Sequence, residues 1–295
     1  MGTVSEGPKE FRFRFIKDHR ERFGVRYLCR KLSVSFSGFY KWLARPISSI
    51  VTKNEGLTHS IKVIFERHDG NYGSPRIHRE LLNLGVVVNH KRVARIMREE
   101  RLIAKAARLY RRKALPENPC ITVENLRYNI PPPSGQNQQW AGDVTYLKVK
   151  GEWIYLSVIL DLYSRKIIGW SLGKKRTTEL TLKSLDMAIN TRKFESGLIF
   201  HSDKGAEYGA HIFQNKLRSV GIKPSMNRHK TMTDNIHVES FFRTFKTESF
   251  HDEVFECMDH LYEVTKWYLE DYYNCVRMHT SLCYKSPQQY ERMTA

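Results

Sequence analysis

Residues 140–172, WAGDVTYLKVKGEWIYLSVILDLYSRKIIGWSL, decide the fold class of this chain of 295 residues. The stretch holds three apolar runs, over residues 140–149, 153–160 and 166–172. Gly151 and Ser164 separate these runs as turn residues. Apolar runs of this length, bounded by turn residues, are typical of β-strands, and three in succession predict an antiparallel meander.

Helices and two further strands are predicted after the meander. The apolar pattern predicts helices over residues 179–189, 210–220 and 235–248, and short strands over residues 198–200 and 223–226. The apolar residues of the last helix form one face, which consists of Val238, Phe241, Phe242 and Phe245. A meander followed by alternating helices and strands predicts an α/β fold whose sheet mixes antiparallel and parallel neighbours.

Three carboxylates stand out by their positions in this predicted unit. Asp143 interrupts the apolar first strand, Asp203 follows the short buried strand, and Glu239 lies off the apolar face of the last helix. A buried acid needs a partner, and open α/β sheets bind ligands beyond the carboxyl ends of their strands. Each acid also has an ordinary explanation: Asp203 could cap a turn before Gly205, and Glu239 could pair with Arg243.

The three acids predict a metal site if the fold brings them together. Carboxylates gathered in a small volume raise one another's pKa and cannot all ionise without a cation. Magnesium prefers oxygen ligands, and two such ions can clamp the attacking and leaving oxygens of a displacement at phosphorus. The chemistry indicated is cleavage or transfer of a phosphodiester.

Positive charge is concentrated in the first part of the chain. The formal charge is +18, and residues 1–133 hold 27 Lys and Arg against 12 Asp and Glu. Such asymmetry indicates a nucleic-acid-binding module attached to a unit with a different task. A solubilising surface is the ordinary explanation, but such surfaces usually mix both signs of charge.

Two helix-turn-helix-like units are predicted in this basic part. Residues 25–42 show helix-turn-helix spacing with Ser35 as a cap. In a second unit, over residues 57–102, Gly85 ends one helix and Asn89 caps the next. The capped helix has an apolar stripe opposite a basic face of Lys91, Arg92, Arg95 and Arg98. Such a face is typical of a helix that enters the major groove, although a solvated helix face is the ordinary explanation.

Prolines divide the basic part from the α/β part. Pro116, Pro119 and the triplet at residues 131–133 predict an extended linker. We therefore predict five segments: a helix-turn-helix-like segment over residues 1–50, a second DNA-binding unit over 51–115, a linker over 116–139, a catalytic core over 140–250 and a helical extension over 251–295.

The sequence predicts a cytoplasmic protein. No apolar stretch approaches the roughly 18 residues that a membrane span needs, and the N-terminus has no apolar core of a signal peptide. The five cysteines form no Cys-x-x-Cys pair, which is typical of a reducing compartment.

Four ordered motifs resemble the DDE transposases of insertion-sequence family three, specifically the product of the second reading frame. The first block matches at Trp140, Asp143, Thr145 and Tyr146, and the second at His201, Ser202, Asp203, Gly205 and Tyr208. The third matches at Asp234, Asn235, Glu239, Ser240, Phe241, Phe242, Lys246 and Glu248. The closing block matches at Tyr273, Asn274, Arg277, His279, Leu282, Ser286 and Pro287. The 35 residues between Asp203 and Glu239 are the family's hallmark spacing.

This resemblance implies a ribonuclease-H-like, retroviral-integrase-like core with Asp143, Asp203 and Glu239 as catalytic metal ligands. It implies Mg²⁺, with Mn²⁺ as a substitute, and a contact of Lys246 with the transposon end. Arg243, which lies four residues after Glu239 on the same helix face, is predicted to contact DNA as well. The implied partners are the terminal inverted repeats, target DNA and further copies of the chain in a synaptic complex. A fusion to, or pairing with, the upstream-frame product in a bacterial, nucleoid-associated setting is implied as well.

Two alternatives remain open from the sequence. The loop over residues 227–232 departs from the family pattern, which leaves a non-catalytic DNA-binding regulator derived from a transposase as the rival function. Cys275, His279 and Cys283 are spaced by four residues and could line one helix face as metal ligands.

Overall fold

The computed structural model describes residues 7–44, 49–108, 123–128, 130–228, 235–251 and 253–294. The chain divides into two compact units, Met1–Val63 and Ile64–Ala295. None of the helices in the described residues is long and apolar enough to cross a bilayer.

The first unit is a small helical bundle. It consists of α2 (Lys9–Phe23), α3 (Val25–Lys31), α4 (Phe36–Leu43) and the start of α5 (Ser49–Arg67). Its core is formed by Ile16, Leu28, Cys29, Leu32 and Phe39. Ser35 caps α4, because its hydroxyl accepts a hydrogen bond from the Gly38 amide at 3.2 Å. The two helices predicted within residues 25–42 and their cap are confirmed.

The second unit begins with another set of short helices. The rest of α5 is followed by α6 (Ser74–Asn83), α7 (His90–Glu99) and the 3₁₀ turn η1 (Lys105–Arg108). Asn89 caps α7 by accepting from the Lys91 amide at 2.8 Å, and Gly85 takes a positive φ of 80° after α6. The predicted inner face of α7 is buried and consists of Val93, Ile96 and Met97.

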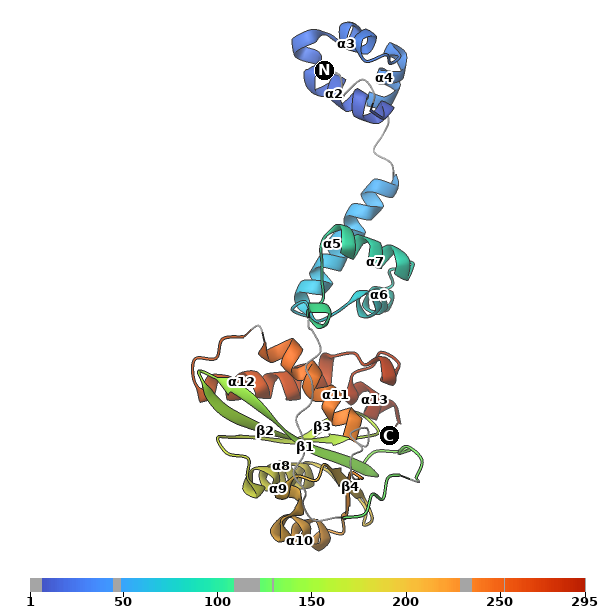
Figure 1. Ribbon diagram of the computed structural model, residues 1–295. Coiled ribbons are helices and arrows are strands. Elements are labelled where there is room, and N and C mark those ends of the chain that lie inside the picture. The colour runs from blue at the N-terminus through green and yellow to red at the C-terminus, as the bar shows by residue number, and fades with distance from the viewer. Residues whose placement is uncertain are drawn as a thin grey trace. The chain divides into compact units, whose positions relative to one another are not determined.

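A five-stranded mixed sheet forms the centre of the second unit (Figure 1). The strands are β1 (Gln139–Val149), β2 (Glu152–Asp161), β3 (Ile167–Gly173), β4 (Ile199–Ser202) and β5 (Lys223–Met226), in the order β3-β2-β1-β4-β5. β1, β2 and β3 form the predicted antiparallel meander, whereas β4 runs parallel to β1 and β5 runs parallel to β4. The predicted α/β fold with a mixed sheet is confirmed.

Helices cover both faces of the sheet (Figure 1). One face carries α8 (Thr178–Thr191), the short α9 (Ala206–Gly209) and α10 (His211–Ser219). The other carries α11 (Ile236–Phe245), α12 (Met258–Lys266) and the π-helical segment η4 (Trp267–Val276). On α11 the predicted apolar face is buried against the meander. The sheet therefore separates two apolar layers.

The C-terminal part differs from the predicted pattern after Phe245 and after Val276. The last predicted helix ends at Phe245 and continues as the π-helical turn η3 (Lys246–Phe250), whose wider turn places Glu248 in the interior. The chain closes with η5 (Thr280–Leu282) and α13 (Pro287–Thr294). Because η4 ends at Val276, the alternative that Cys275, His279 and Cys283 share one helix face is wrong.

Candidate active site

The register of β1 and β4 brings two of the predicted acids together. Asp143 lies within β1, and Asp203 directly follows β4. Gly142 of β1 is aligned with Ser202 of β4, so the two acids are the next residues along adjacent parallel strands. Neighbouring strands lie roughly 4.8 Å apart, and aligned residues of parallel strands project on the same side.

The electrostatics of Asp143 depend on both other acids. Burial raises the pKa of Asp143 well above its ordinary value, and the charges of Asp203 and, more weakly, Glu239 raise it further. A hydrogen bond from the Val144 amide at 2.7 Å and the charge of Arg176 act in the opposite direction. An acid destabilised by two other acids lies where a bound cation is favourable.

The third acid, Glu239, is an exposed residue of α11. Asn235, which precedes this helix, donates from Nδ2 to the carbonyl oxygen of Gly142 at 3.2 Å, and Val238 is fully buried. These contacts hold the first turn of α11 beside Asp143. Among the described residues, no three His, Cys, Asp or Glu side chains lie close enough together to hold a metal ion. The structure therefore pairs Asp143 with Asp203 and leaves Glu239 as a more distant neighbour.

An arginine that the sequence did not single out contacts Asp203. Oδ1 of Asp203 accepts from the Gly205 amide at 2.9 Å, which confirms the turn-capping explanation, and Oδ2 lies 3.4 Å from Nη2 of Arg176. Arg176 also donates from Nε to Oε1 of the buried Glu207 at 2.7 Å. A Cβ at position 205 would lie 2.5 Å from Glu207 Oε1 and 2.9 Å from Arg176 Nη2, so a larger residue would displace the ends of both side chains.

His201 has a structural role. Its Nδ1 lies 2.9 Å from the Ser225 hydroxyl, and its Nε2 lies 2.8 Å from Oδ1 of Asn227. Because an amide oxygen only accepts, Nε2 carries a proton there. The imidazole therefore ties β4 to the end of β5. The six residues after Arg228, which include most of the atypical loop and Asp234, lie outside the described residues.

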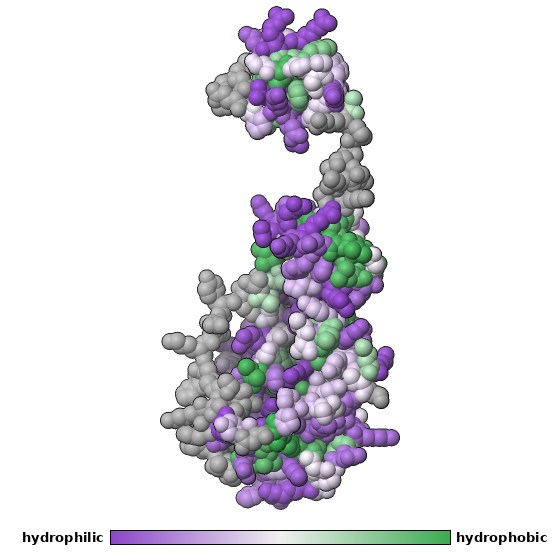
Figure 2. Space-filling view, turned by 90° about the vertical axis from the view of Figure 1, so that its right-hand side faces the viewer, coloured by the Kyte–Doolittle hydropathy of each residue, from purple (hydrophilic) through white to green (hydrophobic). Residues whose placement is uncertain are grey.

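The predicted basic face of α7 is open to solvent. Lys91, Arg95 and Arg98 are exposed and Arg92 is half-buried. Arg95 lies 3.7 Å from Glu99 one turn on, a loose pair on a helix surface. Exposed aliphatic residues accompany this helix, since Leu84 and Val87 in the turn before α7 are 60% and 93% exposed. Figure 2 shows hydrophilic side chains beside hydrophobic ones on the surface of this region.

Two basic residues follow Glu239 along the chain: Arg243 on α11 and Lys246 at the start of η3. Arg243 is exposed, and the Lys246 ammonium lies 4.8 Å from the ring centroid of Tyr146 on β1. Tyr146 meets Trp153 edge to face at 5.1 Å, and both aromatic side chains are about half exposed. Exposed aromatic and cationic side chains next to each other are typical of surfaces that bind nucleic acid.

Hydrogen bonds join the short helices that begin the second unit to its C-terminal part. The Tyr72 hydroxyl accepts from the Met278 amide at 3.0 Å, and Arg76 donates from Nε to the Met278 carbonyl at 3.0 Å. Lys105 donates to the Glu248 carbonyl at 3.3 Å. Local sequence patterns do not reveal these contacts, since the partners lie more than 140 residues apart.

Comparison with known proteins identifies the parts of the chain. Models of the integrase core domain match residues 133–231 and 220–287, and a model of a helix-turn-helix-like domain matches residues 52–113. The chain is 36% identical over 280 residues to the transposase InsF for insertion sequence IS3A of Escherichia coli (strain K12), covering 94% of this chain and 97% of that protein. It is 36% identical over 240 residues to the transposase for insertion sequence element IS904 of Lactococcus lactis, covering 81% of this chain and 95% of that protein.

Solved structures similar to the chain are retroviral. A simian T-cell lymphotropic virus intasome in complex with the PP2A regulatory subunit B56 gamma matches with a TM-score of 0.47 and 20% identity, covering 79% of this chain and 74% of that one. The HTLV-2 integrase catalytic core domain in complex with magnesium matches with a TM-score of 0.42 and 21% identity, covering 54% and 98%.

Proposed function

Because the chain belongs to the transposases of the IS3 insertion-sequence family, we propose that Asp143, Asp203 and Glu239 catalyse its cleavage and joining of DNA strands. The observation that carries this proposal is the alignment of Asp143 and Asp203 on adjacent parallel strands, together with a pKa of Asp143 that both other acids raise. Glu239 is included because the hydrogen bond from Asn235 to the Gly142 carbonyl holds the start of α11 against β1, next to Asp143.

The oxygen chemistry of the acids suits magnesium, with manganese as a substitute: Asp143 and Asp203 would hold the ion, and Glu239, which lies farther away in the described structure, would approach it when DNA is bound. Carboxylate oxygens are the ligands that Mg²⁺ prefers, and a cation would relieve the repulsion that raises the pKa of Asp143. When bound, the metal supplies Lewis-acid activation of the attacking and leaving oxygens at phosphorus. Arg176 and the Gly205 amide orient Asp203, and Asn235 holds the helix of Glu239 against β1.

In this proposal, DNA is both the substrate and the binding partner of the enzyme. The α7 face of Lys91, Arg92, Arg95 and Arg98 would bind DNA within the unit over residues 51–115, alongside the helix-turn-helix-like segment over 1–50. Arg243 and Lys246 would contact the terminal inverted repeats next to the core over 140–250. Synapsis of two ends would use several copies of the chain, with or without the upstream-frame product.

Strand cleavage and joining of DNA that carries the element's own ends tests this function. Wild type and Glu239→Gln are compared with Mg²⁺, with Mn²⁺ and with chelator, at matched DNA occupancy. The proposal predicts metal-dependent products from the wild type and none from Glu239→Gln. If both proteins bind DNA and neither cuts it, even when fused to the upstream-frame product, the regulator is the better account.

A further inference from the structure

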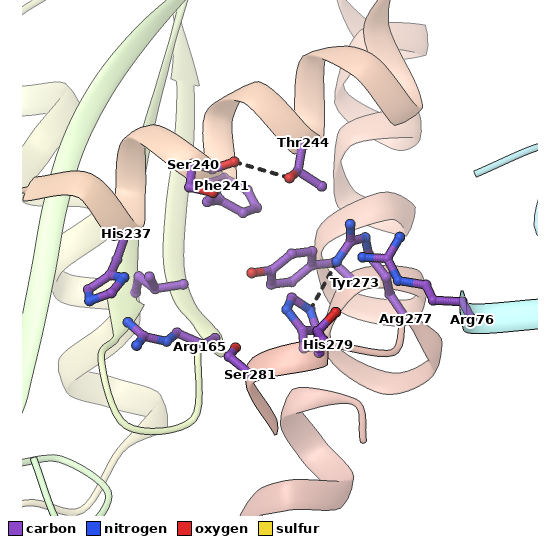
Figure 3. Close-up of a pocket in the computed structure, with 12 residues that line it drawn as sticks. Arg76, Arg165, His237, Ser240, Phe241, Thr244, Tyr273, Arg277, His279 and Ser281 are labelled. Carbon is purple, nitrogen blue, oxygen red and sulfur yellow. Dashed lines mark hydrogen bonds between the residues drawn. The ribbon is translucent and has the colours of Figure 1, made fainter. Parts of the chain in front are cut away.

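A cavity of about 340 Å³ in the second unit gathers basic side chains beside the helix of Glu239. Its lining includes Arg76 from α6, Arg165 from the turn between β2 and β3, and Arg277 and His279 from the closing segment. Figure 3 shows Arg165 and His237 on one side of the cavity, facing Tyr273 and His279 on the other. Among the described residues that line it, none is acidic.

Positive charge in this cavity is only partly balanced. Arg277 is neutralised by Glu248, but Arg76 and Arg165 form no ion pair within the described residues. Burial lowers the pKa of Arg76, and the neighbouring charge of Arg277 lowers it further. Burial likewise lowers the pKa of His279, and all three arginines add to that effect. Two guanidinium groups therefore face the cavity without a direct ion pair in the described residues, and only the longer-range charges of Glu248 and Asp161 offset those of Arg76 and Arg165.

Arg165 is held at this position against two local costs. Its backbone has a positive φ of 61°, a left-handed conformation that is unfavourable for residues with large side chains. Its Nη1 is buried and has no hydrogen-bond partner in the part of the chain that the structure describes. A buried donor without a partner is destabilising. The left-handed backbone closes the turn between β2 and β3, where the Arg165 amide donates to the Asp161 carbonyl at 2.8 Å. The unpaired Nη1 would gain a partner if a ligand oxygen reached it.

The other polar groups of the cavity can complete the coordination of an anion. The His279 ring accepts from Arg277 Nη1 through Nε2 at 3.4 Å, because guanidinium groups only donate, so its Nδ1 carries the proton. Ser240 and Thr244 lie one turn apart on α11 and also line the cavity. Ser240 directly follows Glu239, so a ligand here would lie beside the helix of the third acid.

We propose that this cavity binds a phosphodiester group of the DNA backbone, held by the guanidinium groups of Arg165 and Arg76. The proposal rests on the proposed function, which supplies DNA as the substrate. Guanidinium groups match the geometry of phosphate oxygens and suit a site that must hold an anion firmly. An acidic peptide would meet the same groups, but the shared helix with Glu239 favours the polymer that the acids cut. The bonds of Tyr72 and Arg76 to Met278 hold Arg76 at the cavity.

The substitution Arg165→Asn tests the site. Asparagine tolerates a left-handed backbone and removes the unpartnered guanidinium, so the melting temperature should stay the same or rise. The affinity for duplex DNA carrying the element's ends should fall about tenfold, and the slope of log K against log salt should decrease by about one, because one phosphate contact is lost. Fluorescence anisotropy across a KCl series measures both without divalent metal.

Controls separate this proposal from others. Arg218→Asn removes an equal charge from the exposed surface of α10 and should leave the affinity within about twofold of wild type. An unchanged salt slope in Arg165→Asn, or a lowered melting temperature, would overturn the proposal, as would a polyglutamate peptide that competes as well as duplex DNA. Since the assay contains no metal, a failure of the three catalytic acids would leave this result intact.

Discussion

Glu248 and Arg277 form a buried, two-pronged ion pair across 29 residues of sequence. Nε and Nη2 of Arg277 donate to Oε2 and Oε1 of Glu248, each at 2.7 Å. The Tyr268 hydroxyl donates to the same Oε2 at 2.9 Å. The pair ties the π-helical turn after α11 to the closing segment, so it fixes both the far end of the Glu239 helix and one wall of the cationic cavity.

Removing one partner of this pair should be strongly destabilising. Glu248→Gln leaves the Arg277 guanidinium buried without its counterion, and we expect the free energy of unfolding to fall by about 3–5 kcal/mol. Urea denaturation measures the change. The exposed pair of Glu179 and Lys183, at 3.1 Å on α8, is the matched control, and Glu179→Gln should change stability by less than about 0.5 kcal/mol. Equal effects of the two substitutions would contradict the importance of the buried pair.

Loss of the Asn235 anchor should slow catalysis without weakening DNA binding. Asn235→Ala removes the bond from Nδ2 to the Gly142 carbonyl, which holds the start of α11 against β1. A displacement of Glu239 by about 1 Å is expected to reduce the rate of strand cleavage by up to 100-fold. Single-turnover cleavage and anisotropy on the same DNA check this expectation. A normal rate would show that α11 is positioned by its apolar face alone.

The C-terminal helix should stabilise the fold in a pH-dependent manner. Burial opposes ionisation of Glu291, but bonds from Arg192, Ser164 and Lys166 outweigh it, and its pKa is lowered. A lowered acid pKa stabilises the fold above the unfolded value and loses this effect as the pH falls through the folded value. Glu291→Gln should therefore be less stable than wild type by about 3 kcal/mol at pH 7, and the difference should shrink below about pH 4. Thermal unfolding of both proteins across this range shows whether the two curves converge.

The basic face of α7 should contribute non-specific phosphate contacts. Arg95 and Arg98 are exposed, so the double substitution to alanine should leave stability within about 0.5 kcal/mol of wild type. We expect the salt slope of DNA binding to decrease by about two, as two contacts are lost. Lys183→Ala with Arg218→Ala, on α8 and α10, serves as the charge-matched control. A slope that changes equally in both double variants would exclude α7 as the DNA-contacting helix.

Local patterns in the sequence predicted most of the elements correctly. The three strands of the meander, both caps and the inner face of α7 depend on neighbours within a few residues, so periodicity and capping residues reveal them. The five-stranded mixed sheet confirms the predicted α/β fold, and the identity to the transposase InsF confirms the predicted family. The roles of the three acids and of the DNA-contact residues stay predictions, although β1 and β4 align the first two acids.

Contacts between distant segments could not be predicted in this way. Arg176 lies in a loop 27 residues before Asp203, and nothing in its sequence neighbourhood indicates that it contacts this acid. The π-helical turn after Phe245 has no local signature either, because it depends on burying Glu248 against Arg277. Arg165 became notable only when its backbone conformation and its unpartnered nitrogen were known. These features arise from tertiary packing.

The most direct test of the catalytic account compares two acids that share one arginine. Asp203 and Glu207 both contact Arg176, but only Asp203 is proposed to hold the metal. Single-turnover strand joining is measured for Asp203→Asn and Glu207→Gln at matched DNA occupancy with Mg²⁺. The account predicts a rate loss of at least about 1,000-fold for Asp203→Asn and of less than about tenfold for Glu207→Gln. Equal losses in the two variants would contradict a catalytic role for Asp203. Both losses would then be explained by a displaced Arg176, which contacts both acids.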